Sequence, residues 1–306
     1  DDSTAFNPKH FLAPRYWPLW IAFGLMWSLA QLPMRVRFWI GRRLGDTLGT
    51  LHRPRRAIAK KNIDLCFPEW TEQKRRRLLH QQFQSLGMSL IEMASLWFGD
   101  VEEIKRRTKI IGLENLQPHP GTPGNILLQA HFSTLEIVAC VFSTAFPIYA
   151  NYDKPKNLLY RSFLLHQRER FMPELISNNN IRRMARCLRE GQTVWYSPDQ
   201  FVKTNQGGVP TTFFSQPTNT TDATSRLARI TGARVVPFLT LRTSKHGYWE
   251  ARVSTPLDDF PGEEPAADTQ RINDLLESVI REHPEQYFWV HKRFKRMDAS
   301  QPDPYR

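Results

Sequence analysis

The hydrophobic pattern of the chain changes near residue 108. Before that point, an uncharged apolar stretch covers residues 17–34, and apolar side chains then recur at helical spacing over residues 35–65 and 71–98. After it, short apolar runs alternate with helix-like segments. The pattern therefore predicts an N-terminal helical region followed by a domain in which strands and helices alternate.

The uncharged stretch has two interpretations. Its 18 residues include several tryptophans, and as a helix they would reach about 27 Å, slightly less than the roughly 30 Å of a bilayer core. A cleaved signal peptide is the alternative, because residues 28–30 read Ser-Leu-Ala, a small-x-small pattern. Many lysines and arginines follow the stretch and few precede it, which favours a retained anchor. We predict a membrane anchor over residues 1–34 and a cytoplasmic domain over residues 35–306.

The two segments after the anchor are expected to be helices. Residues 35–65 place leucines on one face and basic residues elsewhere, a pattern typical of a helix lying on anionic headgroups. A solvated charged face is the other possibility. The next helix is expected to begin after Thr71, a probable N-cap, and to pack in the core.

Strand-like and helix-like segments alternate over the rest of the chain. The strand-like segments are residues 109–116, 125–130, 147–152, 193–199, 234–243 and 248–257, and the helix-like segments are residues 133–145, 157–171, 180–190, 220–231 and 269–284. This order predicts an α/β fold with a mostly parallel central sheet flanked by helices. In such sheets, functional residues gather where loops leave the carboxyl ends of strands.

The charge and the cysteine content limit which partners and which cellular compartment suit the protein. Lysine and arginine total 42 against 30 acidic residues, so the net charge of +12 suits a polyanionic partner: nucleic acid, anionic lipid or an acidic protein. The three cysteines, Cys66, Cys140 and Cys187, show no paired or metal-binding spacing. They indicate a reducing compartment, and we expect neither disulfides nor a metal site.

One histidine and one glutamate form the main candidate for chemistry. His131 follows the predicted strand 125–130, and Glu136 would lie in the first turn of the next helix. Glu136 could then accept the imidazole N–H and stabilise the ring when its other nitrogen takes a proton. The alternative is structural, because residues 133–136, Ser-Thr-Leu-Glu, also fit a capping box.

Other catalytic motifs are missing from the sequence. It contains no G-x-S-x-G, no phosphate-binding P-loop motif and no dinucleotide-binding G-x-G-x-x-G, and no cysteine has an evident activating partner. We therefore expect no cofactor. A lone histidine base suggests direct attack of a substrate hydroxyl on an activated acyl group, without a covalent enzyme intermediate.

Six segments together resemble a known family. They read "PRYWPLW", "NIDLCFPEWTEQKRRR", "HFSTLEI", "VWYSPDQ", "RLARITGARVVPF" and "PEQYFWVHKRFK". The chain resembles the secondary, or late, acyltransferases of lipid A biosynthesis, a lauroyl and myristoyl transferase branch of the glycerolipid acyltransferase superfamily. The resemblance covers nearly the whole chain. It implies a glycerol-3-phosphate acyltransferase-like fold preceded by an N-terminal membrane helix.

The resemblance also implies roles for individual residues. His131 would be the general base and Glu136 its partner. In the second family block, Arg168 is favoured as a phosphate ligand, with Arg170 and Arg161 as further candidates. Asp199 matches an acidic position in the third block and is a substrate-site candidate, although a strand-ending turn would also explain Pro198-Asp199.

The implied reaction takes place at the inner membrane of Gram-negative bacteria, on its cytoplasmic side. Acyl carrier protein would supply the acyl group, and a hydroxyl on a hydroxyacyl chain of a Kdo-bearing lipid A precursor would accept it. We expect a monomer that binds no nucleic acid. The alternatives are a lysophospholipid acyltransferase that uses the same chemistry and, more remotely, a membrane-tethered basic binding protein without enzymatic activity.

Overall fold

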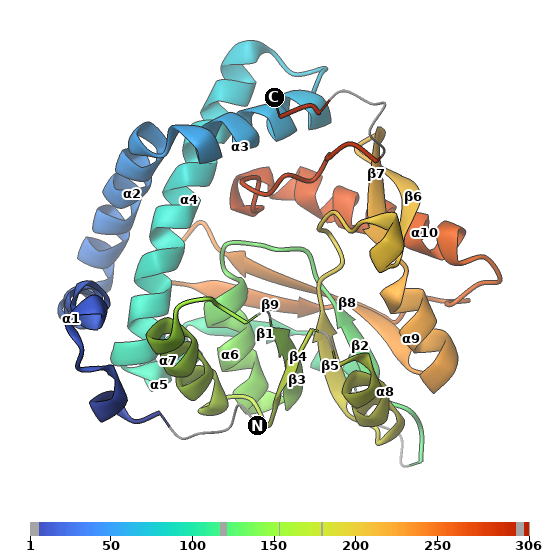
Figure 1. Cartoon of the computed structure of the whole chain (residues 1–306), viewed down its shortest axis with the longest axis horizontal. Coiled ribbons are helices and arrows are strands. Elements are labelled where there is room, and N and C mark those ends of the chain that lie inside the picture. The colour runs from blue at the N-terminus through green and yellow to red at the C-terminus, as the bar shows by residue number, and fades with distance from the viewer. Residues whose placement is uncertain (1–5, 117–120, 153, 179, 298–302, 306) are drawn as a thin grey trace.

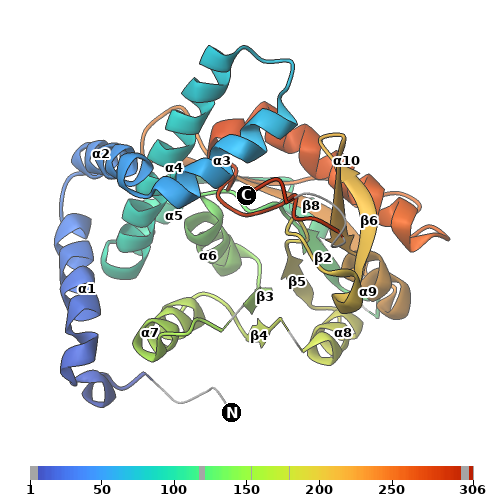
Figure 2. The ribbon, with the colours of Figure 1, turned by 45° about the horizontal axis from the view of Figure 1, so that its top comes forward.

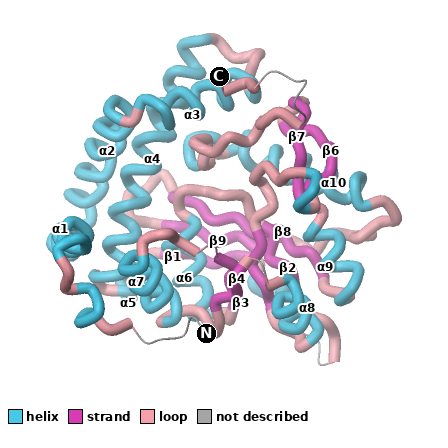
Figure 3. Tube along the Cα trace, viewed as in Figure 1, coloured by secondary structure: helices cyan, strands magenta, loops and turns pink. Residues whose placement is uncertain are grey.

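A seven-stranded sheet lies at the centre of the protein, with helices on both faces (Figure 1). The computed structural model describes residues 6–116, 121–152, 154–178, 180–297 and 303–305. Within the sheet the strand order is β1-β9-β8-β2-β5-β3-β4, and a separate hairpin is formed by β6 and β7. Figure 3 shows this division, with the strands gathered centrally and the helices outside them.

Neighbouring strands of the sheet run parallel except β8 and β9, which are antiparallel. The strands are β1 (Thr108–Ile111), β2 (Asn125–Leu128), β3 (Ile148–Tyr152), β4 (Leu175–Ser177), β5 (Thr193–Tyr196), β6 (Gly208–Phe213), β7 (Gln216–Thr221), β8 (Arg234–Arg242) and β9 (Trp249–Val253). The predicted α/β fold with a mostly parallel sheet is confirmed.

Ten α-helices lie in the described residues. They are α1 (Trp17–Ala30), α2 (Met34–Leu51), α3 (Arg53–Cys66), α4 (Glu72–Phe98), α5 (Val101–Arg106), α6 (Leu135–Ala145), α7 (Leu158–Glu169), α8 (Ile181–Arg189), α9 (Ala223–Thr231) and α10 (Pro265–Glu282). In Figures 1 and 2, α1 and α2 lie on one side of the molecule and α8 and α9 on the other.

The central strands are apolar on both faces and join two hydrophobic clusters. In β2, Ile126 and Leu128 point into a cluster shared with α3, α8, α9 and α10, while Leu127 points into a second cluster shared with α1, α6 and α7. This alternation follows from the two-residue period of a strand. A sheet covered on both faces needs continuous apolar strands, as the sequence provides.

The N-terminal helix differs from the expected membrane span. Residues 17–34 were expected to be helical throughout, but α1 ends at Ala30 after 14 residues and α2 begins at Met34. In the described part of the chain, no helix combines the length and the apolar character needed to cross a bilayer. Instead α1 packs on the domain, where the Phe23 ring stacks on Phe163 at 4.2 Å between centroids. A domain boundary at residue 34 stays a prediction.

Two further segments differ from their expected structure. The helix expected over residues 35–65 is interrupted at His52, because Pro54 lacks the backbone N–H that a continuous helix requires. Residues 220 and 221 end the hairpin strand β7 rather than beginning a helix. That strand carries the polar sequence Gln-Pro-Thr-Asn-Thr-Thr, which lacks the apolar alternation used to recognise strands.

Candidate active site

Sheet register brings His131 and Asp199 together. The adjacent parallel strands β2 and β5 pair Leu128 with Tyr196, and His131 and Asp199 each lie three residues beyond that pair. Parallel neighbours end at the same edge of a sheet, so both loops leave it side by side. The two residues are 68 positions apart in sequence and in direct contact in the fold.

Asp199 holds His131 with both carboxylate oxygens. The imidazole Nδ1 lies 2.6 Å from Oδ1, and the backbone N–H of His131 donates to Oδ2 at 3.0 Å. Burial alone would raise the pKa of Asp199, but the charge and hydrogen bonds of His131 outweigh it and lower that pKa to about 2. An ionised carboxylate only accepts hydrogen bonds, so Nδ1 carries the hydrogen and Nε2 is the ring nitrogen that can take a proton.

Glu136 makes neither of the contacts expected from the sequence. Both its oxygens accept from Arg168, with Nε at 2.9 Å from Oε1 and Nη2 at 2.6 Å from Oε2. The carboxylate on the imidazole is thus Asp199, which corrects the expected partner of His131. A capping box does not form either: the N-cap of α6 is Thr134, without a side-chain cap, and Ser133 Oγ lies 2.7 Å from Ser85 Oγ.

The three arginines proposed as phosphate ligands have different surroundings. Arg168 is mostly buried, and although burial would lower its pKa, the charge and hydrogen bonds of the adjacent Glu136 raise it, so the guanidinium stays charged. Arg170 is exposed and donates to the backbone oxygen of Trp97 at 3.2 Å. Arg161 is partly exposed on α7. Their roles toward phosphate stay predictions.

The loop that carries His131 is bound to a distant segment of the chain. Phe288 N–H donates to the His131 carbonyl at 2.9 Å, and Ser133 N–H donates to the Gln286 carbonyl at 2.7 Å. Phe132 and Tyr287 form an antiparallel bridge between these contacts. Residues 286–288 therefore lie beside residues 131–133 and fix the backbone of the candidate base.

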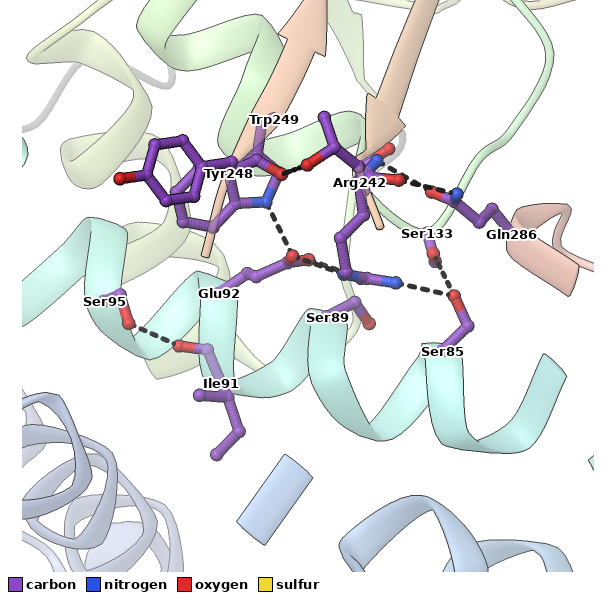
Figure 4. Close-up of polar contacts among 12 residues, drawn as sticks. Ser85, Ser89, Ile91, Glu92, Ser95, Ser133, Arg242, Tyr248, Trp249 and Gln286 are labelled. Carbon is purple, nitrogen blue, oxygen red and sulfur yellow. Dashed lines mark hydrogen bonds and ion pairs between the residues drawn. The ribbon is translucent and has the colours of Figure 1, made fainter. Parts of the chain in front are cut away.

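A buried ion pair is connected to the same loop through two serines, as Figure 4 shows. Arg242, at the end of β8, forms two hydrogen bonds of 2.7 Å with Glu92 on α4. Its third donor, Nη1, reaches Ser85 Oγ at 2.9 Å, and Ser85 contacts Ser133 (Figure 4). Trp249 Nε1 also donates a hydrogen bond to Glu92 Oε1, at 2.7 Å. Helix α4 is thereby connected through polar contacts to the loop two residues from His131.

Two cavities meet at His131. One, the polar cavity of about 610 Å³, is lined by both apolar and polar side chains, and the polar ones include Asn151, Arg168, Gln200 and Arg226. The other, of about 200 Å³, lies between α4 and α6 and is largely apolar; its lining includes Leu86, Leu90, Met93, Ile137 and Phe288. His131 and Leu135 border both. A single imidazole thus faces one polar space and one apolar space.

Three residues around the pair were missed as site residues in the sequence. Gln200 Nε2 lies 3.3 Å from His131 Nε2 and 3.2 Å from His291 Nε2. Tyr287 is buried beside Asp199, and burial together with the charge of Asp199 raises the pKa of its phenol well above the ordinary value. Gln200 directly follows Asp199, and Tyr287 and His291 lie in the family-like segment "PEQYFWVHKRFK", but that segment reaches the site only through the fold.

Among the described residues, neither a reactive cysteine nor a cluster of metal ligands lies at this site. The three cysteines are buried and free, and burial raises the pKa of Cys66 and Cys140 well above that of an ordinary thiol. Across the described ranges, no group of three or more His, Cys, Asp or Glu side chains is placed to hold a metal ion. The expectation that no cofactor is needed stays a prediction.

Comparison with known proteins gives matches along almost the entire chain. Residues 5–296 match the family described as bacterial lipid A biosynthesis acyltransferase. The lipid A biosynthesis lauroyltransferase of Escherichia coli K12 is 32% identical, with 96% of each chain covered. The palmitoleoyltransferase of the same organism is 30% identical, with 97% of each chain covered.

Two further similarities complete the comparison. A lipid A biosynthesis acyltransferase of Haemophilus influenzae is 32% identical over 98% of this chain and 97% of its own. A crystal structure of a 1-acyl-sn-glycerophosphate acyltransferase from Thermotoga maritima aligns with 84% of this chain and 100% of its own, at 13% identity and a TM-score of 0.38. From the extent of the family match and the identity of the full-length relatives, we conclude that the chain belongs to the bacterial lipid A biosynthesis acyltransferase family.

Proposed function

We propose that this protein transfers a fatty acyl group from the thioester of acyl carrier protein to a hydroxyl on a hydroxyacyl chain of a Kdo-bearing lipid A precursor. The observation that carries the proposal is the His131–Asp199 pair, with Nδ1 and Oδ1 2.6 Å apart, at the junction of a polar and an apolar cavity. Family membership supplies the reaction class. The donor, the acceptor hydroxyl and the location are part of the proposal.

His131 acts as the general base in this mechanism. Its Nε2 removes the proton of the acceptor hydroxyl as that oxygen attacks the thioester carbonyl. Asp199 keeps the hydrogen on Nδ1 and stabilises the imidazolium that forms. Glu136 holds Arg168 at the wall of the polar cavity. The acyl group passes directly to the acceptor oxygen without a covalent enzyme intermediate.

The two cavities suit two parts of the substrates. Moving an acyl chain from water into an apolar space lowers the free energy. The chain therefore suits the apolar cavity between α4 and α6. A phosphorylated glycolipid suits the wider polar space, where Arg168 and Arg226 provide guanidinium groups. Both substrates then meet at His131.

A basic surface on α8 suits an acidic carrier protein. Arg182, Arg186 and Arg189 are exposed there, and with Ile230 they line a depression of about 550 Å³. Ile181 borders both this depression and the polar cavity that reaches His131. Complementary charge would bring the carrier to the mouth of the site and speed its association.

The N-terminal helices suit attachment to the cytoplasmic face of the inner membrane. Trp17, Ile21 and Leu25 recur every four residues along α1 and are 58%, 64% and 61% exposed. Arg35 follows at the start of α2. A row of exposed apolar side chains beside basic residues is typical of a helix that lies in a membrane interface.

A comparison of acceptors tests the proposal. The purified protein receives a radiolabelled acyl carrier protein thioester together with either the lipid A precursor or lysophosphatidate. We expect label to appear on the lipid A precursor. Preferential labelling of lysophosphatidate would instead identify a lysophospholipid acyltransferase. Failure to label either lipid, with salt-sensitive binding to duplex DNA, would favour a non-enzymatic basic binding protein.

A further inference from the structure

The side-chain amide of Gln200 bridges the imidazoles of His131 and His291. Both contacts go through the same atom, Nε2, at 3.3 Å to His131 Nε2 and 3.2 Å to His291 Nε2. An amide nitrogen carries two hydrogens, so it can donate to both rings. Both rings can accept at Nε2: Asp199 holds the hydrogen of His131 on Nδ1, and burial lowers the pKa of His291 to about 4, which keeps that ring neutral and lets Nε2 accept when the hydrogen is on Nδ1.

This arrangement places Gln200 in competition with the acceptor substrate. A hydroxyl that gives its proton to His131 must lie roughly 2.6–3.2 Å from Nε2. The Gln200 N–H occupies the same lone pair in the substrate-free protein. When the hydroxyl binds, that N–H loses its partner beside the reacting atoms, while the second N–H remains on His291.

We propose, on the basis of the acyl transfer described above, that the Gln200 amide donates a hydrogen bond to the acyl carbonyl oxygen during transfer. His291 is a positioning residue in this proposal. By accepting one N–H it keeps the amide nitrogen turned toward His131. Without that acceptor the amide could rotate and present its oxygen, which would repel a developing negative charge.

The chemical step needs such a donor. The hydroxyl oxygen bonds to the thioester carbon, its proton moves to His131 Nε2, and the carbonyl electron pair moves onto oxygen. The tetrahedral intermediate then collapses, the carbon–sulfur bond breaks, and the leaving thiolate takes the proton from His131. The negatively charged oxygen lies two bonds from the attacking atom, within reach of the N–H that this atom displaced. Gln200 lines the same cavity as His131.

Replacing Gln200 tests this role, and replacing another glutamine serves as the control. Gln73 is exposed on α4, outside the cavity that Gln200 lines, so Gln73→Ala is the control. We expect Gln200→Ala to lower kcat by about 10²- to 10³-fold, the usual cost of one oxyanion donor, with KM for either substrate changed less than threefold. Gln73→Ala should keep kcat within about threefold of the parent.

Three more variants separate hydrogen-bond donation from side-chain shape. Gln200→Glu keeps the size but removes the donor, so we expect a similar loss of kcat. Its carboxylate would also raise the pKa of the imidazole and move the acid limb of the pH–rate profile to higher pH. His291→Ala should lower kcat, and His291→Gln, which offers an amide oxygen as acceptor, should restore most of it.

The outcomes also distinguish this inference from the proposed function. An active parent and an inactive His131→Ala, combined with Gln200→Ala at full kcat, would overturn the role of Gln200 and leave the proposed function intact. A loss that appears in KM alone would overturn it as well. A parent that transfers no acyl group would instead refute the proposed function. Thermal unfolding midpoints close to the parent's would show that the Gln200 variants are folded.

Discussion

Asp199 lies in the interior of the protein with 2% of its surface exposed, and it commits one oxygen to the His131 ring and the other to the His131 backbone. The backbone contact fixes the loop, and the ring contact fixes the tautomer. Its pKa of about 2 keeps the carboxylate ionised at every pH at which an enzyme of this kind would work. In the proposed mechanism, the atom that acts as the base is therefore Nε2 of His131.

Replacing this carboxylate by an amide tests the assignment. We expect Asp199→Asn to lower kcat by roughly 10²- to 10⁴-fold, because an amide can donate to Nδ1 and so favour the wrong tautomer. The proton NMR resonance of the His131 Nδ1–H should disappear in Asp199→Asn and remain in Glu136→Gln. The reverse pattern would make Glu136 the functional partner of the imidazole.

The sequence revealed the members of this pair but not their contact. His131 could be placed at the end of an apolar run that reads as a strand, and Asp199 was a substrate-site candidate because it matches an acidic position in the third block of the family. Their contact depends on β5 pairing with β2, although β3 and β4 come between them in the chain. Strand order is a property of the whole fold, so local patterns favoured the nearer carboxylate, Glu136, instead.

The second histidine should make stability depend on pH. Burial lowers the pKa of His291 from 6.5 to about 4, so between these values the unfolded chain binds one proton more than the folded chain. The free energy of unfolding therefore falls as the pH drops through this window, by up to roughly 1.4 kcal/mol per pH unit from this residue. Urea denaturation at pH 7 and pH 5 should show a smaller acid loss in His291→Gln than in the parent. An equal loss in both proteins would contradict the pKa shift.

At the scale of elements, glycines set the approach of α2 to α4. Gly41, Gly45 and Gly49 recur every four residues on α2 and are buried against α4. A Cβ on Gly87 of α4 would lie 2.1 Å from the Gly41 carbonyl oxygen and 2.3 Å from the Gly45 nitrogen. These are backbone atoms, so the two helices can cross this closely only without side chains at the contact. This spacing is visible in the sequence, but its partner on α4 is not.

Adding a single methyl group at this contact should therefore push the two helices apart. Alanine normally stabilises a helix relative to glycine by about 1 kcal/mol. We expect Gly87→Ala to have the opposite effect and to lower the free energy of unfolding by roughly 1–3 kcal/mol, because the added carbon meets backbone atoms. Gly24→Ala on α1 is the control, since its Cβ would meet no atom within 4 Å. Equal or higher stability of Gly87→Ala in chemical denaturation would rule out this close packing.

Two elements also show why the sequence pattern did not predict their structure. The uncharged stretch at residues 17–34 was interpreted by its length, but Gln31 and Pro33 lie between α1 and α2, and Pro33 caps the second helix. The hairpin β6–β7 was not predicted, because threonines and an asparagine occupy its inward positions. Two of the threonines accept hydrogen bonds from Asn273 on α10, Thr211 at 3.1 Å and Thr220 at 3.0 Å.

At the scale of the whole molecule, two surfaces lie on opposite sides of the sheet. Figures 1 and 2 both place α1 on one side and α8 on the other. In the proposed arrangement, the exposed apolar row of α1 meets the membrane and the arginines of α8 meet the carrier protein. The water-soluble donor and the lipid acceptor would then approach the site from different directions.

Vesicle binding tests the membrane surface. Ile21 and Leu25 are 64% and 61% exposed, and burying a side chain of this size contributes about 1.5–3 kcal/mol. We expect Ile21→Gln/Leu25→Gln to weaken binding to anionic phospholipid vesicles by at least about tenfold in a sedimentation assay. Ile230→Gln, which changes an apolar residue 49% exposed on α9, should have little effect. Equal weakening by both variants would exclude a specific role for α1.

The most direct test of the account is the rate of acyl transfer to the lipid A precursor with and without the candidate base. Labelled acyl carrier protein thioester is mixed with excess enzyme, and ester product is measured over a single turnover for the parent and for His131→Gln. We expect His131→Gln to fold normally and to be at least about 100-fold slower, since general-base catalysis contributes roughly 10²- to 10⁴-fold. Transfer by His131→Gln at the parent's rate would contradict the central claim.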